Sequence, residues 1–344
     1  MGFVNYSETL IRNADGDILN FYVKNKKLFL RKFKSESGWD TSNEIIDNVI
    51  YDKLSIEIDK EDKIYGVAIT ESGNVLYIHT DKDNNIKLSE LFDYDYQKYL
   101  LIYPYINKSG SNLHIIYYLQ DIRNNKTWAI YSHYFDGKEW IQNNVDFVLS
   151  YPMLNTFEVV SNENDLNIFY INTINGVEQI FLSEFNNVNK SWDKPIQITN
   201  TNNKKLYLNV LNEKNDYHIT WSEFVNNNLL IKYTKGYFDE DIFSISNIIN
   251  ISELSNCSFP TFIKTGDVLW NVWTQMNNIY SSYSFDNGKT WSDPRMDSES
   301  IKNKFIIYKF RTNNIEDLNQ FKLNTTFGTN KMSFIGFKNI KKMG

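Results

Sequence analysis

The stretch Ser284-Phe-Asp-Asn-Gly-Lys-Thr-Trp291 decides the fold of this chain. Its turn formers Asp286 and Gly288 predict a tight hairpin between two strands. Trp291 then places a large apolar ring beneath the turn, and the hydroxyls of Ser284 and Thr290 can bond nearby backbone groups. The pattern S-x-D-x-G-x-T-W therefore indicates a structural hairpin whose five key residues are these.

Weaker copies of the same hairpin recur along the chain. Trp39, Trp140 and Trp192 follow similar turn sequences, and the successive spacings up to Trp291 are 101, 52 and 99 residues. The two long spacings are each about twice the short one, so we expect one copy without its tryptophan in each long gap. The chain is thus a series of units of about 50 residues.

Two further sets of residues recur with this period, and we call each set a column. One column ends strand-like runs and comprises Phe33, Phe135, Phe185, Phe238, Phe285 and Phe337. The other, which we call the aromatic column, recurs at intervals of 46 to 54 residues and comprises Tyr22, Ala68, Tyr117, Tyr170, Trp221, Trp273 and Phe327. Runs rich in Ile, Val, Tyr and Phe alternate with Asn, Asp, Gly and Lys, which predicts short strands and turns. No amphipathic helix of more than two turns is expected.

Four short strands in each unit of about 50 residues are typical of propeller blades. We expect an all-β fold, a seven-bladed β-propeller of four-stranded blades, forming one domain over residues 1–344. The seventh unit shows three strands, at 304–312, 321–329 and 331–339. We expect the segment from Gly2 to Ser7 to supply its fourth strand and close the ring. The alternative is a six-bladed ring with a C-terminal extension.

Composition narrows the class of protein. The net charge is −6 and only five arginines are present, which argues against unspecific binding of nucleic acid. One cysteine, Cys257, excludes an internal disulfide. The sequence contains no run of 18 apolar residues, so no membrane span is predicted. The N-terminus lacks the features of a signal peptide, so we expect a cytoplasmic protein, unless it is exported by a route without one.

The motif S-x-D-x-G-x-T-W is the Asp-box, and with the repeat it makes the chain resemble the sialidase-like (BNR-repeat) β-propellers and, more narrowly, propeller proteins of clostridia. The resemblance spans the whole chain through the repeat, although only one box is complete. The superfamily contains sialidases, other glycosidases and lectins, so the fold does not fix the function.

The resemblance also implies what a sialidase would need. Its first substrate-gripping arginine lies in an Arg-Ile-Pro motif on the innermost strand of the first blade. Here Tyr6-Ser7-Glu8 stands about nine residues before the Asp15-Gly16 turn, and Arg12 is out of register. The missing arginine argues against sialidase activity.

Three carboxylates, Glu57, Glu158 and Glu223, are candidates for catalysis because they fall on expected inner and second strands, and a glycosidase needs a pair of carboxyl groups. The alternative for each is an exposed strand carboxylate. Trp128 and Trp270 lie outside the aromatic column and are candidates for a ligand-binding platform. Trp221 and Trp273, inside the column, are expected in the core between blades.

No motif indicates a metal or a cofactor. His114 and His218 occupy equivalent positions in their repeats, which favours a structural role over metal binding. We expect a non-catalytic, lectin-like module that recognises carbohydrate or a surface polymer. One alternative is a divergent glycoside hydrolase or sialidase-like enzyme, which requires axis-facing carboxylates in one deep pocket. The other is a scaffold for protein partners, which requires an exposed apolar patch. Oligomeric state is left open.

Overall fold

The computed structural model describes residues 7–34, 36–150, 153–161, 165–240, 242–329 and 332–337. The runs of alternating apolar residues form strands throughout this part of the chain, as the sequence predicts. Its two helices, α1 (Glu299–Lys302) and α2 (Ile315–Gln320), span four and six residues. Nothing described here is a helix longer than two turns, and no described helix is long and apolar enough to cross a membrane.

The strands come in successive antiparallel groups, in which most strands pair with the next one along the chain and a short last strand in three groups returns to pair with the third. The first four groups are β1 (Ser7–Arg12), β2 (Ile18–Lys24), β3 (Lys27–Lys34), β4 (Gly38–Trp39) and β5 (Asn43–Asp47); β6 (Val49–Ile58), β7 (Ile64–Thr70), β8 (Asn74–Thr80) and β9 (Ile86–Asp93); β10 (Tyr99–Ser109), β11 (Asn112–Asp121), β12 (Thr127–Phe135) and β13 (Trp140–Leu149); and β14 (Glu158–Ser161), β15 (Leu166–Ile174), β16 (Val177–Asn186), β17 (Ser191–Trp192) and β18 (Ile196–Gln197).

The remaining groups follow the same plan. They are β19 (Lys205–Glu213), β20 (Asp216–Val225), β21 (Asn228–Asp239), β22 (Ile242–Ile245) and β23 (Ile249–Asn250); β24 (Ser258–Thr265), β25 (Val268–Gln275), β26 (Asn278–Ser284) and β27 (Arg295–Met296), with β29 (Phe321–Lys322) on the free side of β24; and β28 (Phe305–Thr312), β30 (Thr325–Thr329) and β31 (Phe334–Ile335).

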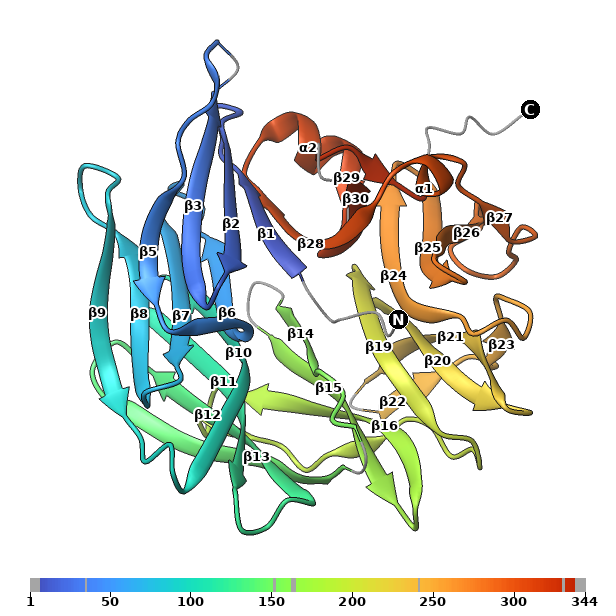
Figure 1. Ribbon diagram of the computed structural model, residues 1–344. Helices are drawn as coiled ribbons and strands as arrows, with labels where there is room; N and C mark the ends of the chain where they lie inside the picture. Colours follow the sequence, from blue (N-terminus) through green and yellow to red (C-terminus); the bar gives the residue numbers. More distant parts are fainter. Residues whose placement is uncertain are drawn as a thin grey trace.

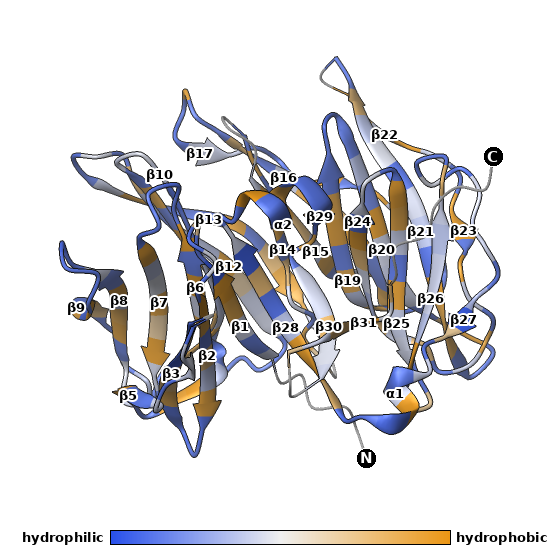
Figure 2. Ribbon diagram, turned by 90° about the horizontal axis from the view of Figure 1, so that it is seen from above, coloured by the Kyte–Doolittle hydropathy of each residue, from blue (hydrophilic) through white to orange (hydrophobic). Residues whose placement is uncertain are grey.

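The groups are arranged in a ring (Figure 1), with the first strand of each group nearest the middle and the later strands toward the rim. Neighbouring first strands contact one another, as β6 and β10 do, and likewise β14 and β19. Seen from above, the apolar segments follow the strands and the polar segments gather in the connecting loops (Figure 2). This arrangement of small antiparallel sheets is consistent with a β-propeller.

The first and last groups are joined by hydrogen bonds into one sheet. Strand β1 pairs with β28 in parallel, from Ser7 opposite Ile307 to Arg12 opposite Thr312. The pairing is parallel because both are first strands, which run in the same direction along the middle of the ring. Of the N-terminal segment expected to close the ring, only Ser7 lies within the described residues.

The last group departs from the sequence prediction in one respect. The strand expected at 321–329 is divided, because Phe321 and Lys322 pair with β24 while Thr325 to Thr329 pair with β28. Between the two pieces, the carbonyl of Asn324 accepts a hydrogen bond from the amide of Phe310. The third expected strand is represented by Phe334 and Ile335.

The hydrophobic core lies between consecutive groups. Each of six buried clusters draws on two neighbouring groups, and one of them also includes Leu10 of β1. The aromatic column falls on the second strand of each group, and Trp221 and Trp273 are fully buried there. The period of the sequence is therefore the period of the packing, because each second strand fills the gap to its neighbour.

The hairpin at 284–291 is closed by a local hydrogen-bond network. The Ser284 hydroxyl oxygen accepts from the amide of Gly288 at 2.8 Å, and the Asp286 carboxylate accepts from the amide and the hydroxyl of Thr290 at 2.8 and 2.6 Å. Trp291 donates from Nε1 to the Gly288 carbonyl and packs edge-on against Tyr233, with ring centroids 5.0 Å apart. Ser284 and Asp286 thus hold the turn, and the half-buried Trp291 anchors it to the neighbouring group.

Candidate functional site

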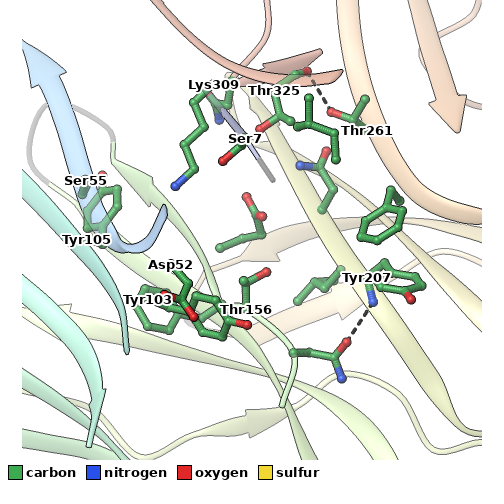
Figure 3. Close-up of a pocket in the computed structure, with 18 of the residues that line it drawn as sticks. Ser7, Asp52, Ser55, Tyr103, Tyr105, Thr156, Tyr207, Thr261, Lys309 and Thr325 are labelled. Atoms are coloured by element: carbon green, nitrogen blue, oxygen red, sulfur yellow. Dashed lines mark hydrogen bonds between the residues drawn. The ribbon is translucent and has the colours of Figure 1, made fainter. Parts of the chain in front are cut away.

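A cavity of about 210 Å³ lies in the middle of the ring, where the first strands meet (Figure 3). It is lined by side chains from the first strand of every group, β1, β6, β10, β14, β19, β24 and β28. We call it the axial cavity, and its principal residues are Glu57, Tyr105, Glu158, Asn209, Thr261 and Lys309. No other feature described here gathers residues from all the groups, so this is where residues from every repeat meet.

Five lining positions are equivalent by strand register. Each is paired with the residue that precedes a member of the aromatic column on the second strand, and they are Ser55, Tyr105, Glu158, Asn209 and Thr261. Four of these positions carry a neutral polar side chain. Only Glu158 places a carboxyl group at this level of the cavity, so its charge is not a requirement of the repeat.

Three aromatic residues reach the cavity from distorted backbone. Tyr103, Tyr207 and Phe259 adopt φ angles of 52°, 57° and 53° and lie where β10, β19 and β24 are interrupted by bulges. Positive φ is unfavourable for a bulky side chain, and such strain concentrates at functional sites. The rings of Tyr207 and Phe259 lie 4.1 Å apart at their centroids. The bulges thus turn aromatic rings toward the middle, where a regular strand would not place them.

In the lining of the cavity, Arg311 of β28 forms an ion pair with Glu57 of β6. The same guanidinium donates from Nη1 to the carbonyls of Phe310 and Asn324, each at 2.9 Å. Burial by itself lowers the pKa of Arg311, but the neighbouring Glu57 outweighs burial and raises it. Arg311 is therefore a permanent, fixed cation, and Glu57 is its partner.

Lys309 and Glu158 face the same cavity without such partners. Among the residues that the structure describes, neither side chain has a hydrogen bond or an ion pair within 4 Å. Burial raises the pKa of Glu158 to about 7, although the nearby cations Lys309 and Arg311 oppose the shift. Burial, together with Arg311, lowers the pKa of Lys309, and Glu57 and Glu158 oppose that shift. The charge of the cavity therefore changes close to neutral pH.

Other polar groups complete the lining. The Asp52 Oδ1 atom is buried and has no hydrogen-bond partner in the described part of the chain, and burial raises the pKa of Asp52. Burial also raises the pKa of Tyr105, with a further contribution from Glu57. The Thr261 hydroxyl donates to the Thr325 carbonyl at 2.9 Å, and Asn155 accepts from the amide of Tyr207 at 3.0 Å (Figure 3).

The structure brings together two of the three carboxylates singled out in the sequence. Glu57 and Glu158 both line the axial cavity. Glu223 lies elsewhere, buried within its own group, where it accepts hydrogen bonds from Trp221 Nε1 at 3.0 Å and from Asn203 at 3.2 Å. The alternative of an exposed strand carboxylate describes none of the three.

The two tryptophans singled out as a platform both lie in the core. Trp128 is 7% exposed and packs edge-on against Tyr118, and Trp270 is 4% exposed and donates to the Thr265 hydroxyl at 3.1 Å. Neither tryptophan lines the axial cavity. The aromatic residues that line the cavity at its bulges are instead Tyr103, Tyr207 and Phe259.

Sequence reasoning overlooked these aromatics and the two cations of β28, although signals were present. Tyr103, Tyr207 and Phe259 are separated by 104 and 52 residues, which are two repeats and one repeat. Lys309 and Arg311 alternate with Tyr308 and Phe310 along a first strand, which places both cations on one face.

A second hollow lies beside the hairpin at 284–291, lined by Glu213, Lys264, Phe285 and Asp286 among others. Its cation is already paired, because Lys264 donates to both oxygens of Glu213 at 2.9 and 2.8 Å. It therefore offers less to a ligand than the axial cavity. Within the described residues, no three His, Cys, Asp or Glu side chains are grouped so that they could hold a metal ion.

No family model matches the sequence, and no curated protein is similar to it. Solved structures do share the fold. A polysaccharide lyase of family PL25, an ulvan lyase bound to -[GlcA(1-4)Rha3S]-, is 10% identical, with a TM-score of 0.58 over 95% of this chain and 93% of that one. The lectin BP39L from Burkholderia pseudomallei is 10% identical, with a TM-score of 0.57 over 85% of each chain. Likeness at this identity shows the fold alone, and this fold serves both an enzyme and a lectin.

Proposed function

We propose that this protein is a carbohydrate-binding module, a single-domain propeller of the sialidase-like, Asp-box type with seven blades, that holds one sugar unit of a glycan in the axial cavity. The observation that carries the proposal is the placing of Tyr103, Tyr207 and Phe259 in the cavity by strained bulges. Strain of this kind persists only where the surrounding structure imposes it, and it is common at binding sites.

The size and lining of the cavity suit a sugar ring. At about 210 Å³ it is smaller than the roughly 300–1,000 Å³ of sites for drug-sized ligands, which leaves room for a small polar ring. Aromatic faces cover the apolar side of such a ring, while amide, hydroxyl and charged groups fix its orientation. Asn209, Thr261 and Lys309 supply groups of these kinds.

A second candidate function, cleavage of the glycan, is favoured by Glu158. A carboxyl group whose pKa lies at about 7 can hold a proton at neutral pH and donate it to a leaving oxygen. A second carboxylate, Glu57, lines the same cavity. This is the arrangement that the enzyme alternative requires, although the ion pair with Arg311 engages Glu57.

The test is an array of bacterial and host glycans, probed with the wild-type protein and with Tyr207→Ala. We expect retention of one glycan class by the wild type and at least a tenfold loss with Tyr207→Ala. Tyr237→Ala, at an exposed position on β21 outside the cavity, is the matched control and should bind normally. Disappearance of the bound glycan over time, abolished by Glu158→Gln, would establish cleavage instead.

A blank array would contradict both candidates. The scaffold alternative would then be tested at β13, an outer strand whose Phe147 and Leu149 are 63% and 50% exposed.

A further inference from the structure

Resting on the proposed function, we propose that the axial cavity selects saccharides that carry a negatively charged group, a carboxylate or a sulfate, and that Glu158 takes up a proton when such a ligand binds. Lys309 is the specificity-determining cation. The inference goes beyond carbohydrate recognition because it fixes the charge of the ligand and the pH at which it is held.

The argument begins with the charges that already have partners. Glu57 neutralises Arg311 through their ion pair, and the backbone carbonyls of Phe310 and Asn324 hold the same guanidinium in place. This pair leaves no net charge. The remaining cation of the cavity is Lys309, which has neither an ion pair nor a hydrogen bond to any described residue.

Lys309 is partly buried. Withdrawing a cation from water without a partner is costly, so a ligand that supplies the missing negative charge is stabilised by it. Lys309 reaches the cavity from β28 (Figure 3). Ser7, Thr261 and Thr325 also line the cavity and are uncharged. Lys309 is thus the cation of the cavity without an ion pair, and this makes it the group that distinguishes an acidic sugar from a neutral one.

Glu158 is the group that competes with such a ligand. Glu158 interacts electrostatically with Lys309 and Arg311. Its ionised form would therefore repel an anion bound at Lys309. Its protonated form would not. An anionic ligand therefore binds best when Glu158 is neutral, and binding draws a proton onto Glu158.

The other titratable groups of the cavity do not produce the same effect near neutral pH. Glu57 of β6 is held by Arg311, and Asp52, also on β6, interacts with Lys53 and Glu71 rather than with Lys309. Burial raises the pKa of the phenols Tyr51, Tyr105 and Tyr207, so these remain protonated. Tyr103 is a further phenol, and no histidine is among the lining residues.

The pH dependence follows from these charges. If Glu158 must be protonated in the complex and its pKa is about 7 in the free protein, affinity for an acidic glycan should fall about tenfold from pH 6 to pH 8. Binding at pH 7 should take up about half a proton per ligand. At more alkaline pH, loss of the proton from Lys309 should weaken binding further, since burial lowers its pKa.

The experiment uses matched glycans on the wild-type protein at pH 6 and pH 8. The array presents uronate oligosaccharides with their methyl esters, and sulfated oligosaccharides with their unsulfated parents. We expect binding of acidic members only, stronger at pH 6. The paired sets tell a carboxylate ligand from a sulfate ligand. Calorimetry at pH 7 with the best-bound glycan, in two buffers of different ionisation heat, then measures proton uptake without any substitution.

Variants assign the two roles, after thermal unfolding has shown that each is folded. Glu158→Gln should bind at pH 8 as tightly as the wild type binds at pH 6, and should take up no proton. Lys309→Met should lose the preference for acidic glycans, and Lys309→Arg should keep it.

Binding of neutral glycans alone would overturn this inference and leave the proposed function standing. Equal binding of acidic glycans at both pH values would overturn the role of Glu158. Absence of all glycan binding would remove the proposed function and this inference with it.

Discussion

Glu57 and Arg311 form an ion pair in the lining of the axial cavity, although 254 residues separate them in the sequence. The pair links β6, in the second group of strands, to β28, in the last. It therefore ties together elements on either side of the seam where β1 pairs with β28. Both side chains are largely withdrawn from solvent, at 13% and 22% exposure, so the pair is screened less than a surface pair.

Glu57→Gln should destabilise the protein by about 3–5 kcal/mol, because it leaves Arg311 buried without its partner. Chemical denaturation measures this difference. The double variant Glu57→Gln with Arg311→Gln should recover part of the loss, since both charges are then gone. Glu44→Gln removes an exposed pair with Lys27 and serves as the control, with little change expected. Equal losses from Glu57→Gln and Glu44→Gln would contradict the buried pair.

Trp291→Ala should cost about 3 kcal/mol, because it removes the ring that packs against Tyr233 and donates to Gly288. Thermal unfolding of the variant checks this. Trp140→Ala is a matched control, since Trp140 stands in a weaker copy of the hairpin and is 44% exposed. An unchanged melting temperature for Trp291→Ala would show that the hairpin is not anchored as described.

Glu158 should make stability depend on pH. Its carboxyl has a folded pKa of about 7 and an ordinary value of 4.5, so the folded protein binds more protons between these limits. The contribution of Glu158 is then fully present below about pH 4.5 and is lost as the pH rises through 7, by up to about 3 kcal/mol. Glu158→Gln should remove that part of the pH dependence and be the more stable protein at pH 8. Parallel stability curves for the two proteins would mean that Glu158 is not buried in its charged form.

Tyr207→Asn should separate stability from binding. Asparagine tolerates positive φ better than tyrosine, so the relief of strain offsets part of the packing lost against Phe259. We expect a melting temperature within a few degrees of the wild type and at least a tenfold loss of glycan binding. A variant that binds normally would show that the Tyr207 ring is not part of the ligand surface.

Much of the fold could be predicted from the sequence, because the repeat depends on interactions between residues that are close together in the chain. The turn formers and tryptophan at 284–291, the alternation of apolar residues and the aromatic column each act over a few residues, and each recurs with the same period. Phe321–Thr329 shows the limit: its division between two partners depends on which strand edges are open, and a single segment does not carry that information.

The site could be predicted only in part. Glu57 and Glu158 were recognisable as strand carboxylates, but whether a strand face points to solvent, to the core or to the axis depends on how the groups close into a ring. The same uncertainty made Trp128 and Trp270 look suitable for a ligand, when burial between strands occupies both rings.

The sequence by itself determined the strands, the turns and the period, because these follow from side-chain alternation and backbone preference over short distances. Only the tertiary structure decided which residues share the axial cavity, because it draws one strand from every repeat. Three features follow from that convergence: Glu57 pairs with Arg311, Lys309 has no partner among the described residues, and the pKa of Glu158 is raised. The burial and the charge of the side chains in the axial cavity depend on the closed ring, and no single repeat determines them.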